Sequence, residues 1–104
     1  MYRQMSMGYG MENKCCQMFF AMGDGNRLRI LELLMKEELC VSDICKRFDI
    51  TQPSISHHLD ILKRSGLVKS EKRGREVFYS FNRDAIVECC GEQFSLFNLK
   101  LSKE

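Results

Sequence analysis

The sequence has no long hydrophobic run, which argues against a membrane-spanning helix. Charged residues interrupt every apolar stretch before it reaches the roughly 20 residues that a span requires. The first residues, MYRQMSMGYGMENK, also lack an apolar core of signal-peptide length. We therefore expect a cytoplasmic protein with no membrane partner.

The motifs of common enzyme classes are missing as well. There is no CxxC pair at a strand-to-helix turn, no glycine-rich phosphate loop and no Ser/His/Asp set or acidic pair placed for acid–base chemistry. The only histidines are the adjacent His57 and His58. These absences argue against an enzyme, and they leave few ligands for a hard or borderline divalent metal.

Cysteine, in contrast, is abundant. The six residues form two adjacent pairs and two single positions: Cys15-Cys16, Cys40, Cys45 and Cys89-Cys90. An even number in a short chain is consistent with disulfides, but adjacent cysteines bridge each other poorly and the chain is not rich in Gly and Pro loops. We expect reduced thiols, available for metal ligation or redox sensing, although any one of them could be a small buried hydrophobe.

The formal net charge of +2 conceals a local basic stretch. Between Lys63 and Arg75, six basic residues stand against Glu71 alone, so the rest of the chain is acidic. A basic stripe on an acidic body is typical of a nucleic-acid-binding surface. A merely solvated face would explain the stripe if it stood alone.

Apolar spacing predicts two helices early in a chain of 104 residues, which is the usual length of a single domain. Residues 1–12, rich in Met and Gly, are expected to be a flexible segment before one domain over residues 13–101. A first helix over residues 14–22, with Cys15, Phe19 and Met22 at helical spacing, should end at Gly23-Asp24-Gly25. A second, over residues 27–38, is capped by Asp24 or Asn26 and has an inner face of Leu28, Leu31, Leu34 and Met35.

The most informative segment is TQPSISHHLDILKRSG, residues 51–66, which follows a short helix predicted over residues 42–48 with Ser42 as its cap. Thr51 is a suitable N-cap, Pro53 suits the first turn, and Gly66 should end the helix. Apolar residues at helical spacing anchor it to the core: Ile55, Leu59 and Leu62. A short helix, a tight turn and a second helix with polar groups at its start predict a helix-turn-helix.

Two strands and a last helix complete the predicted order. Residues 67–72 and 76–81 read as a β-hairpin with Arg73-Gly74-Arg75 at its tip, a candidate wing against DNA. A helix capped by Asn82 or Asp84 should run to about residue 99. Its apolar stripe is Ile86, Cys90, Phe94, Phe97 and Leu101. In so small a chain, a second subunit is expected to cover it.

This arrangement resembles the winged helix-turn-helix of the ArsR/SmtB family. The resemblance rests on MGDGNRLRILELL, on ELCVSDICKRFDITQPSISHHLDILKRSGLV and on the wing KRGREVFYSFN, covering about residues 18–82. It implies a mainly α fold with a small β-hairpin, in the order of four helices, two strands and one helix. It also implies a homodimeric repressor that dimerises through its terminal helices, binds double-stranded operator DNA and is released by an inducer.

The DNA-binding residues expected from this reading lie on the second helix of the motif and on the wing. Ser, Gln and His side chains can hydrogen bond to base edges, and Lys and Arg neutralise phosphates. For the two histidines, metal ligation or a plain surface role is the alternative. The set is Gln52, Ser54, Ser56, His57, His58, Lys63, Arg64, Arg73 and Arg75. No cofactor is required for DNA binding.

The inducer is expected to be arsenite or a soft metal ion. In the resembling family, the segment matching ELCVSDIC often carries a Cys-Val-Cys pair that binds such ions, but Ser42 replaces the second cysteine here. The carboxylate and histidine ligands that resembling zinc sensors carry on the last helix are also missing. Arsenite favours three thiolates, and we expect Cys15, Cys16, Cys89 and Cys90 to supply them, with Cys40 as a second choice.

Two other interpretations keep the DNA-binding fold. In one, the cysteine pairs form a redox or persulfide switch, which an oxidant would operate without metal. In the other, the cysteines are structural and the protein is constitutive or acts through a protein partner. Serine substitutions would then leave DNA affinity and its regulation unchanged.

Overall fold

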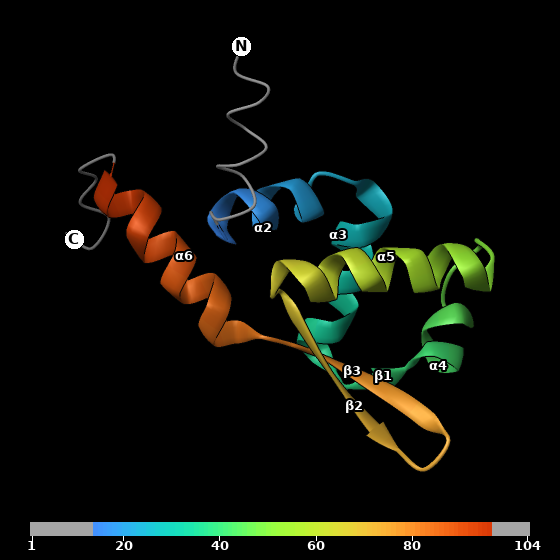
Figure 1. The fold of residues 1–104 in the computed structure, drawn as a ribbon. Coiled ribbons are helices and arrows are strands. Elements are labelled where there is room, and N and C mark those ends of the chain that lie inside the picture. The colour runs from blue at the N-terminus through green and yellow to red at the C-terminus, as the bar shows by residue number, and fades with distance from the viewer. Residues whose placement is uncertain (1–13, 97–104) are drawn as a thin grey trace.

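The computed structural model describes residues 14–96, with side chains through residue 91. Along this part the elements are α2 (Lys14–Met22), α3 (Gly25–Lys36), β1 (Leu39–Cys40), α4 (Val41–Cys45), α5 (Gln52–Ser65), β2 (Val68–Arg73), β3 (Glu76–Phe81) and α6 (Arg83–Leu96) (Figure 1). None of these helices is long and apolar enough to cross a membrane. The predicted segment 1–12 and the last stripe side chains, Phe94, Phe97 and Leu101, lie outside the described residues and side chains.

Helix α2 has the predicted bounds, and α3 begins at a well-formed cap. The Asp24 carboxylate accepts hydrogen bonds from the backbone N–H groups of Asn26 and Arg27, at 3.0 and 3.1 Å. Asp24 is therefore the cap rather than Asn26. Helix α3 ends at Lys36, two residues earlier than predicted, because Glu37 is already extended (φ −160°, ψ 153°) as the chain turns into β1.

The buried faces of α2 and α3 differ from the prediction. In α3, Leu28 and Met35 are 41% and 58% exposed, whereas Ile30 is fully buried. In α2, Phe19 is 54% exposed and Met18 is buried in its place. Neighbouring helical positions point about 100° apart. The apolar residues of each helix are therefore compatible with two alternative buried faces, which differ by a rotation of the helix about its axis. In α3, tertiary packing selected the buried face that includes Arg27.

The short helix of the helix-turn-helix was predicted too long and with the wrong cap. It spans Val41–Cys45 rather than residues 42–48, and its N-cap residue is Cys40, with no side-chain cap hydrogen bond. Ser42 lies inside the helix. Cys45 is only partly buried and packs at the edge of the core.

The β-structure is a three-stranded antiparallel sheet in the order β1-β3-β2, rather than a hairpin alone. The hairpin of β2 and β3 was predicted, but β2 begins and ends one residue later than expected. The short β1 was missed. It pairs through Leu39 with Tyr79 and through Cys40 with Phe78. Two residues carry no strand periodicity, so only this long-range pairing defines β1.

Helix α5 lies at the centre of the fold, where it contacts α2, α3, α4 and β2 (Figure 1). Three of the six largest fully buried side chains belong to α5 itself: Ile55, Leu59 and Leu62. The other three are Ile30 of α3, Ile44 of α4 and Leu67, which follows α5. The core therefore holds α5 by one face and leaves its other face exposed. Apart from β1, the predicted order of a mainly helical fold with a β-wing is confirmed.

Candidate DNA-binding surface and thiol sites

The amino end of α5 is built as predicted. Thr51 caps it, since its hydroxyl accepts a hydrogen bond from the Ser54 N–H at 3.3 Å, and Pro53 lies in the first turn. The exposed face then carries Gln52, Ser56 and His57, with Ser54 half-buried beside them. The free N–H groups and the positive end of the helix dipole favour a phosphate, and these side chains can reach base edges.

The carboxyl end of α5 is fixed to the base of the wing. Gly66 adopts a left-handed conformation (φ 90°) and ends the helix, as predicted. Asn82, one of the two predicted caps of α6, donates instead from its side chain to the Gly66 carbonyl at 2.9 Å. Its backbone N–H donates to the Leu67 carbonyl at 2.8 Å. The orientation of the wing is thus tied to that of α5.

Two predicted basic residues lie near this end of α5. Lys63 and Arg64 are exposed in its last turn, and Arg64 pairs with Asp60 at 2.9 Å. At about 1.5 Å rise per residue, they lie roughly 16 Å along the axis from Gln52. That separation suits contacts to phosphates away from the bases that the amino end would read.

The two predicted arginines of the wing differ in their surroundings. Arg73 lies 2.8 Å from carboxylate oxygens of both Glu38 and Glu71, and its guanidinium covers the Phe78 ring at 4.7 Å. The hydrogen bond from Arg73 lowers the pKa of Glu71, and the same carboxylates raise the pKa of Arg73. Arg75 is exposed and has no ion pair within the described residues.

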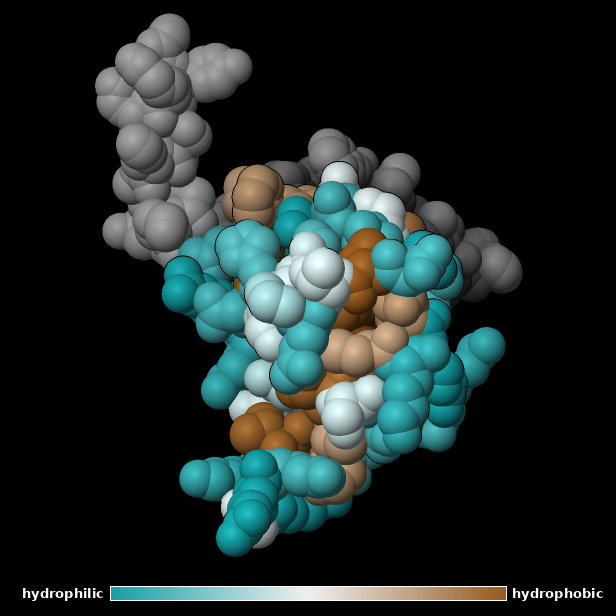
Figure 2. Space-filling model, turned by 90° about the vertical axis from the view of Figure 1, so that its right-hand side faces the viewer, coloured by the Kyte–Doolittle hydropathy of each residue, from teal (hydrophilic) through white to brown (hydrophobic). Residues whose placement is uncertain are grey.

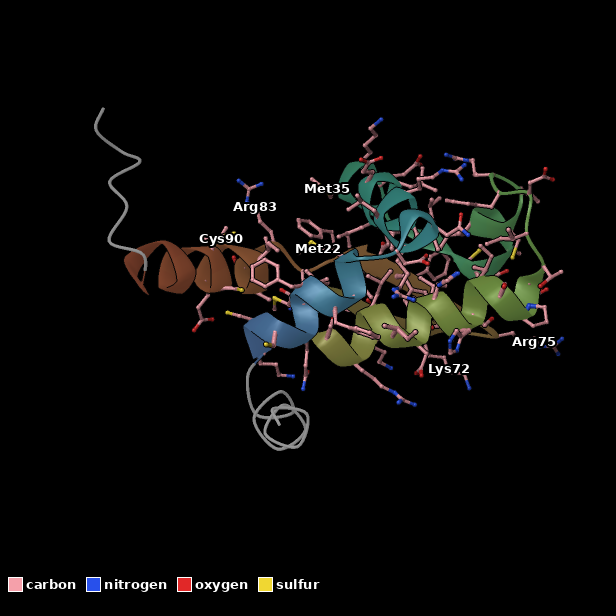
Figure 3. The ribbon with its side chains drawn as sticks, turned by 90° about the horizontal axis from the view of Figure 1, so that it is seen from above. Met22, Met35, Lys72, Arg75, Arg83 and Cys90 are labelled. Atoms are coloured by element: carbon pink, nitrogen blue, oxygen red, sulfur yellow. The ribbon has the colours of Figure 1, made fainter. Side chains whose placement is uncertain are left out.

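The exposed basic residues of the wing and the thiols of α6 lie at opposite ends of the molecule. Figure 3 places Lys72 and Arg75 at the end where α5 begins, and Cys90 and Arg83 at the far end. From the side on which α5 begins, Figure 2 shows a hydrophilic wing tip below the mixed surface of the helices. A DNA-binding surface and a thiol site can therefore be separate.

The structure brings one cysteine of each adjacent pair together. The Cys15 thiol donates to the backbone carbonyl of Cys89 at 3.7 Å, and both residues are buried. Their neighbours face outward to different degrees: Cys16 is exposed and Cys90 is half-buried. Cys40 is buried elsewhere, on β1, with its sulfur 3.3 Å from the Ser42 hydroxyl and from an Asp43 carboxylate oxygen.

Within the part of one chain that the structure describes, no three His, Cys, Asp or Glu residues form a group that could hold a metal ion. The five predicted thiol ligands are thus not assembled into one site in the single subunit. The Cys15–Cys89 contact joins the two pairs.

Sequence reasoning missed the part that Arg27 has in this surface. Its side chain is 9% exposed and lies against α2, and one of its nitrogens reaches His58 of α5. His58 was predicted as a DNA contact, but its side chain is only 13% exposed. The alternative buried face of α3 could have indicated this role, because it places Arg27 on the same side as Ile30, Leu31 and Leu34.

A helix-turn-helix with an exposed, hydrogen-bonding amino end, flanked by a basic β-hairpin, defines a winged helix-turn-helix DNA-binding protein. Residues 24–70 match the model of the bacterial regulatory protein family named arsR. The chain belongs to this ArsR family. It is a transcriptional repressor of that family, not an enzyme.

Similar proteins support this assignment. The chain is 34% identical to the transcriptional repressor SdpR of Bacillus subtilis over 77% of its own length and 89% of that protein's. It is 45% identical to the arsenical resistance operon repressor of Escherichia coli, over 61% of this chain and 55% of that one. The structure of an ArsR-like transcriptional regulator from Rhodococcus matches with a TM-score of 0.75 and 26% identity, over 86% of this chain and 83% of the other.

Proposed function

We propose that the protein represses transcription by binding operator DNA as a homodimer, with the start of α5 in the major groove and the wing against the backbone or minor groove. The observation that carries this is the exposed row on α5, opposite a fully buried face. Base reading is assigned to Gln52, Ser54, Ser56 and His57. Phosphate neutralisation is assigned to Lys63, Arg64, Arg73 and Arg75.

Exposed apolar side chains support the homodimer. Phe19 and Phe20 on α2 are 54% and 68% exposed, and Val87 on α6 is 59% exposed. The helices that carry them pack against each other and are the two outermost helices of the described chain. Burying these groups against a second copy would remove apolar surface from water, at about 25 cal/mol per Å². A symmetric pair would also place two operator-reading helices side by side.

The proposed inducer is a trivalent metalloid such as arsenite, or a soft metal ion, held by cysteine thiolates in a reducing cytoplasm. Cys15 and Cys89 are already adjacent, and Cys16 and Cys90 lie next to them in sequence. A third thiolate drawn to this point would shift α2 against α6, the helices proposed to form the dimer interface. The arsenical and cadmium resistance regulators among the similar proteins favour this ligand class.

A thiol-redox repressor is the second candidate, favoured by the same Cys15–Cys89 contact. Oxidation by a peroxide would join the two sulfurs, with both thiol protons and two electrons passing to the peroxide to give water. A persulfide on one of the thiols is the related possibility.

Counting thiols separates the two candidates. Reduced, metal-free protein is titrated with arsenite under anaerobic conditions, and free thiols are measured at each step. The metalloid proposal predicts loss of about three thiols per arsenic, saturating near one arsenic per chain. No loss at stoichiometric arsenite would reject arsenite as the inducer. Release of DNA by peroxide without metal, unaffected by a chelator, would favour the redox candidate.

A further inference from the structure

Arg27 joins three helices at the junction between α2 and α3. Its Nε donates to the Ala21 carbonyl at 2.7 Å, and its Nη2 lies 3.5 Å from the Phe20 carbonyl. Its guanidinium also covers the Phe20 ring, 5.5 Å from the centroid. These are carbonyls in the last turn of α2, where partners are otherwise scarce. These contacts with α2 fix the position of the Arg27 side chain independently of α5.

The remaining arm of Arg27 meets His58 on α5. Arg27 Nη1 lies 3.4 Å from His58 Nδ1. A guanidinium has donors only, so this hydrogen bond requires an unprotonated Nδ1. His58 must then be neutral, with its proton on Nε2. The contact therefore favours the neutral Nε2–H form of His58 over the protonated ring.

A carboxylate offers His58 a second partner. Asp24 Oδ2 lies 3.9 Å from the same Nδ1, and Asp24 already accepts backbone hydrogen bonds as the cap of α3. A protonated His58 would lose the bond from Arg27 and be drawn toward Asp24. Among the described residues, the charged or titratable groups facing His58 are Asp24 and Arg27 from α3 and His57 from α5, with ring centroids 6.1 Å apart. From α2, the Phe20 and Ala21 carbonyls and the uncharged Phe20 ring contact Arg27 at this junction.

We propose that His58 is a positioning residue of the DNA-binding surface, docked in its neutral form on Arg27, and that it sets the orientation of α5 rather than reading a base. This deepens the proposed function and rests on α5 being the recognition helix. The neighbouring His57 is exposed and carries the base contact. Protonation of His58 weakens operator binding because it disconnects α5 from the α2–α3 junction.

The first test needs no DNA. Nitrogen chemical shifts of the imidazole rings report protonation and tautomer directly. Near pH 7.5, the proposal predicts the Nε2–H tautomer for His58 in the wild type and loss of this preference in Arg27→Met. An Nδ1–H tautomer, or a charged ring, would overturn it. This result is independent of the proposed function.

The second test compares two substitutions on a duplex that the wild-type protein selects from a random pool. Asn carries its amide near the Nδ1 position and can still accept from Arg27, whereas Gln carries it near Nε2. His58→Asn should keep wild-type affinity near pH 7.5 and lose less affinity than the wild type when the solution is acidified. His58→Gln should weaken binding about threefold to tenfold on all duplexes alike.

His57→Gln is the matched control and should change which duplexes are preferred. Arg27→Met should weaken binding as His58→Gln does, and the double variant should add little more. A changed base preference in His58→Gln would overturn the proposal by making His58 a base contact. If neither His57→Gln nor His58→Gln alters binding to a duplex that the wild type does select, α5 is not the recognition helix. In that case it is the proposed function that fails.

Discussion

The Cys15 thiol lies 3.7 Å from the backbone carbonyl of Cys89, although 74 positions separate the two residues. This contact joins the first and last described helices inside one subunit. Because both residues are buried while Cys16 is exposed, we expect ligand binding at this point to move α2 or α6. A thiol ligand can therefore act on the proposed dimer interface without touching the DNA-binding surface.

Changing Cys15 and Cys16 together to Ser should preserve operator binding and abolish the response to the inducer. The physical reason is that Ser keeps the size of the side chain but is a poor ligand for soft ions. Fluorescence anisotropy of a labelled operator, with and without arsenite, measures both properties. Cys45→Ser, at the edge of the core, is the control and should respond as the wild type does. A double variant that still responds moves the site to Cys89, Cys90 or Cys40.

The two wing arginines should differ in the salt dependence of DNA binding. Arg75→Ala should reduce the slope of log Kd against log salt by about 1, because a free arginine releases roughly one counterion on contacting a phosphate. Arg73→Ala should change the slope less, since Glu38 and Glu71 already compensate its charge. Arg83→Ala, at the opposite end of the molecule, is the control. An unchanged slope in Arg75→Ala would remove the wing tip from the DNA-binding surface.

Gly66 should tolerate a side chain poorly. Its left-handed φ of 90° strains any L-residue, so Gly66→Ala should destabilise the fold by about 1–2 kcal/mol. Space is not the cause, because an added Cβ would lie 3.6 Å from the Met18 side chain, an ordinary contact. Gly25→Ala is the matched control, with nothing within 4 Å of the added Cβ and no positive φ. Urea unfolding of both variants checks this prediction, and equal losses would contradict it.

Stability should fall in acid partly through Asp24. The backbone hydrogen bond from Arg27 lowers the pKa of this carboxyl below its ordinary value of 3.8. A carboxyl whose pKa is lower in the folded state than in the unfolded state stabilises the fold at pH values above its unfolded-state pKa. This stabilisation is lost as the pH falls through the folded-state pKa. Asp24→Asn keeps a good cap but cannot titrate.

The difference in urea midpoint between wild type and Asp24→Asn should therefore shrink as the pH is lowered from neutrality past 3.8. A difference that stays constant across this range would contradict the assignment. Asp24→Ala, which removes the cap as well, should be less stable than Asp24→Asn at every pH.

The parts of the fold that the sequence predicted well are those with local causes. Thr51 and Gly66 mark the ends of α5 because capping and a left-handed turn act within a few residues. The hairpin of β2 and β3 likewise follows from strand-forming residues around Gly74, whose φ is positive. Such local features predict the structure correctly because they do not depend on residues that are distant in the sequence.

The errors came from features that distant partners decide. Strand β1 exists only through its pairing with Tyr79 and Phe78. The inner face of α3 could not be chosen between two helical phases until α2 and α5 packed against it, and that choice buried Arg27. The contacts of Arg27 with α2 and with His58 depend on the same packing.

We expect thiol ligation to lower the affinity of the protein for its operator. The most direct measurement is the affinity of the reduced, metal-free protein for a selected operator duplex, by anisotropy, before and after one equivalent of arsenite per chain. A fall of about tenfold or more, absent when Cys15 and Cys16 are both Ser, is the expected result. Unchanged affinity, with arsenite bound and thiols consumed, would contradict the claim.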